Sequence, residues 1–122
     1  MASKPQPAYY SPLPKDLTPE EMNAIQYHRN NLDAGTYLTN PDGSPTTFFG
    51  ARMGTPEGVM YFPTYWHGAK LEPRTAFRLA QASSARFPVY PDEATAAARE
   101  AVIHKVMEED SKLFAKLKKA KR

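Results

Sequence analysis

The sequence predicts a small α+β domain, in which an antiparallel sheet of two or three strands is packed by two helices. Three observations favour this class. Aromatic and β-branched residues typical of strands gather in the middle of the chain, between residues 46 and 66. Helix-start signals and helical periodicity lie on both sides of that region. The 122 residues suit one domain.

The chain opens with a segment rich in proline and tyrosine. Five of its twelve prolines lie in the first nineteen residues, and proline fixes φ and removes a hydrogen-bond donor. We therefore expect residues 1–17 to form an extended arm. Its apolar side chains Tyr9, Tyr10 and Leu13 are poor solvating groups, so we expect the arm to dock either on this domain or on a neighbour, and these three residues are the candidates for partner contact. The alternative is a disordered leader.

A helix is predicted to begin after Thr18. Thr18 is an N-cap residue, Pro19 suits the first helical position, and Glu21 completes a capping box. The stop signals lie between residues 30 and 35. One face of this helix carries Met22, Ile25, Arg29 and Leu32.

The central region predicts two strands, and two further helices follow it. Residues 46–53 and 59–66 read as strands, and both faces of the second are apolar, so we expect both to be covered. A helix is expected from Pro73 to about Ser83, with Ala76, Phe77 and Ala80 facing inward. Residues 87–90 read as an extended connector. The last helix opens at Pro91 and extends to about Lys118, with an inner stripe of Ala94, Ala98, Val102, Val106, Leu113 and Leu117.

The positive charge of the chain belongs to its C-terminal end. The net charge is +3, yet residues 111–122 hold six of the sixteen Lys and Arg and no acid, so the first 110 residues carry −3. We divide the chain into the arm 1–17, a single domain 18–110 and a basic tail 111–122. The tail either binds a phosphate backbone or forms a solvated helix end. The candidate nucleic-acid contacts are Lys112, Lys116, Lys118, Lys119, Lys121 and Arg122.

Motifs that carry chemistry are missing from the sequence. With no cysteine, disulfide scaffolds, thiol catalysis and Cys-type zinc sites are excluded. His28, His67 and His104 have no metal-ligand spacing, and we expect His28 and His104 on helix surfaces and His67 in a turn. Asp110 ends a run of acids that we expect to be solvated. We predict no enzyme activity, no cofactor, no metal site and no membrane span or signal peptide.

The aromatic residues of the central region allow two interpretations. A stacking platform for single-stranded nucleic acid is one. A hydrophobic core is favoured, because so small a domain has few other large side chains to bury. The residues concerned are Phe48, Phe49, Tyr61, Phe62, Tyr65 and Trp66.

The segment from about residue 30 to 110 resembles a small module of virion proteins in tailed bacteriophages. The resemblance starts at the turn Asp42–Thr47, with sequence Asp-Gly-Ser-Pro-Thr-Thr, and continues through Phe62-Pro63-Thr64 and Gly68-Ala69-Lys70-Leu71. A helix containing Ala76 follows, then a short break and a second helix that opens with Pro91-Asp92-Glu93-Ala94. The Gly-Lys-x-Leu element of the family is loosened here by one residue.

This resemblance implies a non-enzymatic structural component of a phage virion, made in the bacterial host cytoplasm. It implies docking on capsid, portal or tail proteins, in several copies, with possible contact between the tail and packaged DNA. The alternative function is a nucleic-acid-binding accessory protein that uses the basic tail.

Overall fold

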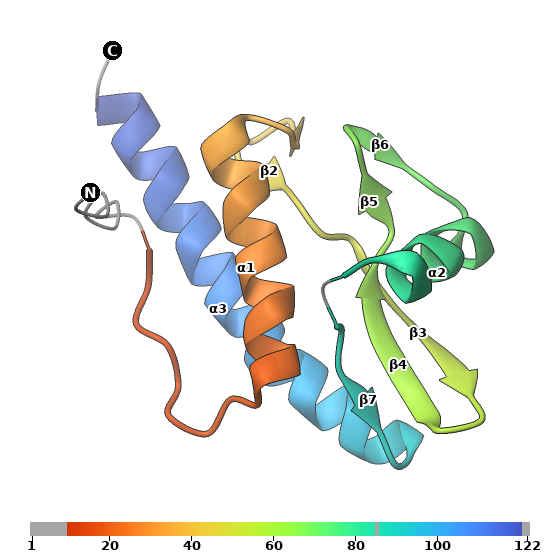
Figure 1. Ribbon diagram of the computed structural model, residues 1–122. Coiled ribbons are helices and arrows are strands. Elements are labelled where there is room, and N and C mark those ends of the chain that lie inside the picture. Colours follow the sequence, from red (N-terminus) through yellow and green to blue (C-terminus); the bar gives the residue numbers. More distant parts are fainter. Residues whose placement is uncertain (1–9, 85, 121–122) are drawn as a thin grey trace, which may run out of the picture.

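The computed structural model describes residues 10–84 and 86–120, with side chains to residue 117. Helix α1 (Pro19–Ala34) lies beside the long helix α3 (Glu93–Ala120), and both lie on one side of the strands (Figure 1). The short helix α2 (Pro73–Ala82) packs on strand β4 from the other side. The described residues form seven strands, which are β1 (Leu38–Thr39), β2 (Pro45–Thr46), β3 (Gly50–Thr55), β4 (Gly58–Pro63), β5 (Tyr65–Trp66), β6 (Ala69–Lys70) and β7 (Val89–Tyr90).

All strand pairs are antiparallel, and the main sheet has the order β3-β4-β7. Two small hairpins, β1-β2 and β5-β6, flank it. The α+β class predicted from the sequence, with its small antiparallel sheet and helix packing, is thus confirmed. The predicted connector 87–90 contributes the third strand, because Val59 of β4 pairs with Tyr90.

Both strands predicted from the sequence are interrupted, and the two breaks face each other. The first strand stops at residues 47–49, where Phe49 has φ of 54°. The second stops at Thr64, whose backbone N–H donates to Phe48 O at 3.0 Å and whose hydroxyl donates to Phe49 O at 2.5 Å. Hydrogen bonds from Thr64 thus take the place of regular strand pairing at this break and hold Phe49 in its positive-φ conformation.

The core lies between the sheet and the helices. Phe48, Tyr61, Phe62, Tyr65 and Trp66 are all buried, which confirms the core interpretation of these aromatic residues. Phe49 is the exception, with 45% of its surface exposed. The inward face predicted for α2 is also correct, since Ala76 and Ala80 are buried and Phe77 packs against the core.

Helix α1 begins as the sequence predicts. Thr18 accepts from the Glu21 N–H at 3.1 Å, and the Glu21 carboxylate accepts from the Thr18 N–H at 2.9 Å. The predicted face of the helix is partly wrong, because Met22 is exposed. Ala24 and His28 are buried in its place, beside Ile25, Arg29 and Leu32.

The buried stripe predicted for α3 is partly wrong. Val106 is buried as predicted, but Ala94 and Ala98 are exposed, and the other buried positions are Ala96, Ile103, Met107 and Asp110. Alanines fill residues 94 and 96–98, so periodicity fits either phase there. The helix continues through residue 110 without a break, and residues 111–120 of the basic tail are therefore its last turns.

Gly50, the first residue of β3 after the break at residues 47–49, lies close to the ring of Tyr61 and allows this packing to be tested. A Cβ at Gly50 would lie 2.7 Å from Tyr61 Cζ, whereas one at Gly54 meets nothing within 4 Å. Because Tyr61 is buried and cannot withdraw easily, we expect Gly50→Ala to lower the free energy of unfolding by about 1–3 kcal/mol. Gly54→Ala, in the same strand, is the control and should change it by less than about 0.5 kcal/mol. Urea denaturation measures both; equal effects would contradict the prediction.

Candidate docking site

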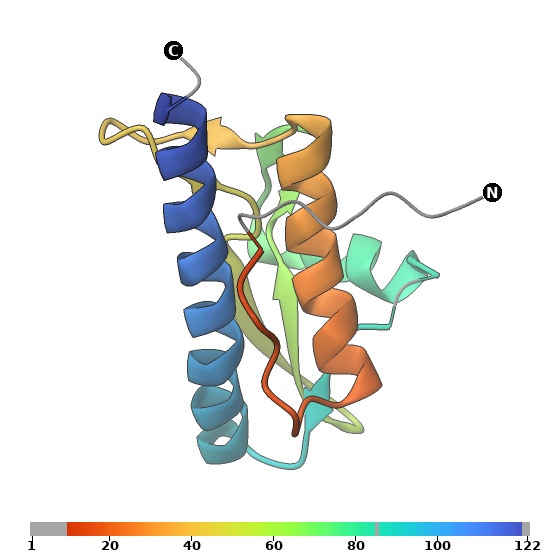
Figure 2. The same cartoon turned by 90° about the vertical axis from the view of Figure 1, so that its left-hand side faces the viewer.

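The arm is attached to the domain at Ser11. Its backbone N–H donates to Asp110 Oδ1 at 2.6 Å, and its hydroxyl donates to the same oxygen at 2.9 Å. Figure 2 shows the described part of the arm running between α1 and α3, toward the turn that precedes α1. The contact between Ser11 and Asp110 thus attaches the arm to α3 at the residue directly before the basic tail.

Asp110 is completely buried, and α1 supplies the cation and the further donor that a buried carboxylate needs beside Ser11. Arg29 binds it with two nitrogens, Nε to Oδ2 at 2.8 Å and Nη2 to Oδ1 at 3.2 Å, and also donates to Ser11 O at 2.8 Å. His28 Nε2 lies 3.2 Å from Asp110 Oδ2, and His28 Nδ1 meets the Thr47 hydroxyl. We call Ser11, His28, Arg29, Thr47 and Asp110 the anchor network.

The anchor network has a definite protonation pattern. Burial alone would raise the pKa of Asp110, but hydrogen bonds from His28, Arg29 and Ser11 outweigh it and lower the pKa to about 2. Burial lowers the pKa of His28 below its usual value of 6.5, against the opposing effect of Asp110. A neutral His28 therefore donates from Nε2 to the carboxylate and accepts at Nδ1 from Thr47.

The structure describes two of the three arm residues predicted to contact a partner, and these two lie in different environments. Tyr10 covers the anchor: its ring lies 4.5 Å from the Arg29 guanidinium carbon, and its hydroxyl donates to Arg29 O at 3.2 Å. Leu13 is 39% exposed and remains accessible to a partner. Tyr9 lies outside the described residues.

A second buried acid fixes the turn between the arm and α1. Burial would raise the pKa of Glu21, but Arg99, Thr18 and Tyr90 bind its carboxylate and lower the pKa to about 2. Arg99 donates to it with two nitrogens at 2.8 and 2.9 Å and reaches Asp16 Oδ2 at 3.0 Å. The segment 11–18 is thus held at both ends, because Ser11 binds Asp110 of α3 and Thr18 binds Glu21 of α1. Each of these carboxylates is also bound by an arginine of the other helix.

The order hydroxyl, imidazole and carboxylate in Thr47, His28 and Asp110 has the form of a catalytic relay. In this structure the three side chains connect α1, α3 and the segment after β2. Thr47 is 4% exposed and the other two are fully buried, and they satisfy one another's hydrogen bonds inside the domain. Arg29 and Ser11 also occupy the carboxylate. Within the described residues, no group of three or more acids and histidines is placed to hold a metal ion.

The candidate nucleic-acid contacts lie on the last turns of α3. Lys112 and Lys116 are exposed, and Lys112 pairs with Glu108 at 3.2 Å. Phe114 packs edge-on against Tyr37, with ring centroids 5.4 Å apart, so this end of the helix is attached to the loop after α1. Lys118 and Lys119 are helical, their side chains are not described, and Lys121 and Arg122 lie outside the described residues.

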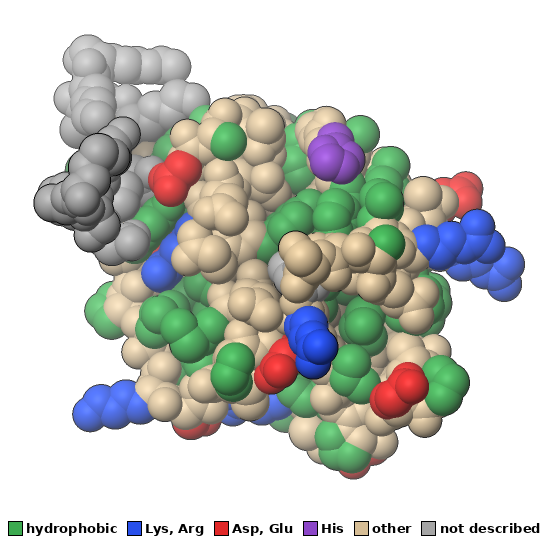
Figure 3. All heavy atoms as spheres, viewed as in Figure 1, with side chains coloured by type: hydrophobic (Ala, Val, Ile, Leu, Met, Phe, Trp, Pro, Cys, Tyr) green, Lys and Arg blue, Asp and Glu red, His purple; other side chains and the backbone are tan. Residues whose placement is uncertain are grey.

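The visible surface offers no large field of one sign. On the face in Figure 3, Lys and Arg lie apart from one another, with acidic and hydrophobic side chains between them. None of the described helices has an apolar stretch long enough to cross a membrane.

Comparison with protein-family models, curated proteins and solved structures finds no match to this chain. The site therefore has to be interpreted from its own chemistry.

Sequence reasoning missed the anchor. His28 and Asp110 were expected at the surface, yet both are completely buried. Asp110 follows two exposed acids, and a pattern cannot show which of three neighbours turns inward. One available signal was Arg29, an arginine on the apolar face of a helix, which requires a buried anion nearby.

Removing the carboxylate tests the anchor directly. We expect Asp110→Ala to lower the free energy of unfolding by about 3–5 kcal/mol, because it leaves the Arg29 charge buried and unpaired. Glu109→Ala, one residue away and exposed, should change it by less than about 0.5 kcal/mol. Chemical denaturation of both variants measures the difference, and a mild effect at Asp110 would show that the anchor does not stabilise the fold.

The buried ionisable groups also predict acid destabilisation in two steps. Because the pKa of His28 is lowered in the folded state, the unfolded chain takes up a proton first and stability falls as pH drops below 6.5. Below pH 4.5, Glu21 and Asp110 add a second loss, which continues to about pH 2 as their carboxylates are protonated. Thermal unfolding between pH 8 and 3 measures this. His28→Gln should remove the first step and leave the second; its persistence would contradict the assignment.

Proposed function

We propose that the chain is a non-enzymatic structural component of a tailed-bacteriophage virion, which docks on head, portal or tail proteins through its terminal segments. The proposal starts from the resemblance of the segment between residues 30 and 110. In the structure this segment comprises the strands, α2 and much of α3.

One observation carries the docking role. The two segments that the sequence marks for docking meet at one buried anchor, because Ser11 of the arm binds Asp110, the residue directly before the basic end. Whatever binds the arm next to Leu13 therefore also lies close to the beginning of the basic segment. An arrangement that holds the arm and the beginning of the basic segment together suits a protein that contacts its neighbours through both segments.

Mass spectrometry of purified virions tests the proposal, and absence of the chain from intact particles would refute it. Deleting residues 2–9 should abolish incorporation and leave the fold intact, because Ser11 still completes the anchor network and Tyr10 still covers it. A longer deletion through residue 14 would also strip donors from Asp110 and confuse docking with stability.

A point variant gives a finer test of the same docking surface. We expect Leu13→Ser to reduce incorporation severalfold, since exposed apolar side chains of an arm gain most from burial against a partner. Val89→Ser is the matched control, because Val89 is 40% exposed but belongs to β7 and not to the arm. Equal incorporation of the two variants would argue against docking through Leu13.

The second candidate function is nucleic-acid binding through the end of α3. It is supported by exposed Lys112 and Lys116, one helical turn apart in a segment without acids. If it holds, duplex DNA binding weakens steeply with salt and is lost when residues 112–122 carry Ser in place of Lys and Arg. Salt-independent binding that survives these changes would point to another surface.

A further inference from the structure

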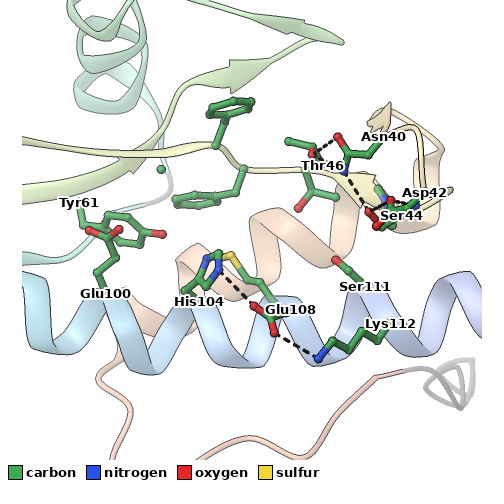
Figure 4. A pocket seen from close by; sticks show the side chains of 16 residues that line it. Asn40, Asp42, Ser44, Thr46, Tyr61, Glu100, His104, Glu108, Ser111 and Lys112 are labelled. Carbon is green, nitrogen blue, oxygen red and sulfur yellow. Dashed lines mark hydrogen bonds and ion pairs between the residues drawn. The ribbon is translucent and has the colours of Figure 1, made fainter.

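A groove with a volume of about 600 Å³ lies between α3 and the segment that links β1 to β3. Figure 4 shows Glu100, His104, Glu108 and Lys112 following one another along α3 as one wall. Side chains of the β1-β2 hairpin and the aromatic residues Phe48, Phe49 and Tyr61 line the remainder. We call this the Phe49 groove.

Phe49 combines two unfavourable features at the edge of this groove. Its φ of 54° is rare for a bulky aromatic residue, and 45% of its surface is exposed. Two hydrogen bonds from Thr64 to its carbonyl oxygen, at 2.5 and 3.2 Å, hold the strained backbone in place. Lys70 Nζ lies over the ring, 4.0 Å from its centroid, so the face of Phe49 already holds a surface cation. A strained backbone beneath a half-exposed ring is typical of a binding surface.

The charges of the groove favour a cationic occupant. Its lining contains three acids, Asp42, Glu100 and Glu108, against one lysine, Lys112. Glu108 now pairs with Lys112 and Glu100 with Arg52, on the surface where such pairs contribute little. An incoming lysine can therefore replace these partners, while aromatic rings pack against its apolar neighbours.

We propose that the Phe49 groove binds the proline-rich arm of a second copy of this chain. The proposal rests on the docking role proposed above for the arm and names its partner. Residues 1–9 contain Lys4, Pro5, Pro7 and Tyr9, and proline-rich segments dock in aromatic-lined grooves with little loss of chain entropy. Lys4 supplies the cation that the acids of the groove attract.

The position of the anchor favours a second copy over the same chain. Ser11 contacts Asp110 and Val106 O on one flank of the buried face of α3. The groove lies on the other flank, with Glu100, His104 and Ser111. To reach its own groove, an arm would have to cross the exposed face of α3, past Lys105 and Lys116, which repel Lys4. Contact between copies is then either reciprocal, which closes a two-fold dimer, or head-to-tail, which builds a ring or a filament.

Sedimentation velocity of the full chain at low ionic strength tests this inference. We expect self-association that rises with protein concentration and weakens with salt. Phe49→Asn should weaken it at least about tenfold, because asparagine tolerates positive φ but removes the apolar anchor. Lys4→Glu should weaken it similarly, and Val89→Asn, at an exposed position outside the groove, should leave it unchanged.

A fluorescent peptide with the sequence of residues 1–9 provides an independent measurement. Its anisotropy should rise with added full-length chain, and rise much less with the Phe49→Asn variant. A chain that stays monomeric at every concentration, or association that survives Phe49→Asn, would overturn the inference. Incorporation into virions without self-association overturns this inference alone, and self-association of a chain absent from virions overturns only the proposed function.

Discussion

The rest of the structure depends on a single buried carboxylate. Asp110 has no contact with water, so its charge must be neutralised by groups brought from elsewhere in the chain. Arg29 and His28 come from α1 and Ser11 from the arm. These partners set the register between the two long helices and fix the path of the arm at the same time. An apolar residue at position 110 could fill the space, but it could not specify which donors must meet there.

Much of the fold follows from local chemistry and is predictable. The capping box at Thr18 and the prolines that open α1 and α2 depend on near neighbours, and the structure bears them out. Helix α3, by contrast, begins at Glu93, two residues after the predicted start, and the strand predicted at 59–66 is interrupted at Thr64. The misses come from contacts between distant segments. Only the packing of α3 against α1 distinguishes Asp110 from Glu108 and Glu109 or selects the phase of an alanine-rich stretch. The docking residues of the arm remain a prediction, because their partner would lie outside the chain.

Helix α3 contributes to the core, to the anchor of the arm and to the Phe49 groove. Its buried face carries Ile103 and Asp110, one flank holds the arm, and the other forms a wall of the Phe49 groove. Its last turns carry the basic residues. Because one continuous helix displays these surfaces, their spacing is set by helical geometry and does not depend on flexible joints. A partner that binds one surface thereby meets the others in a fixed orientation.

The contact between Ser11 and Asp110 also has a consequence for biosynthesis. The two residues are 99 positions apart, so the acceptor is translated long after its donor. Chains grow from the N-terminus at about 5–20 residues per second, and pairings between distant residues close late in folding. The arm therefore spends almost the entire period of translation without its binding site.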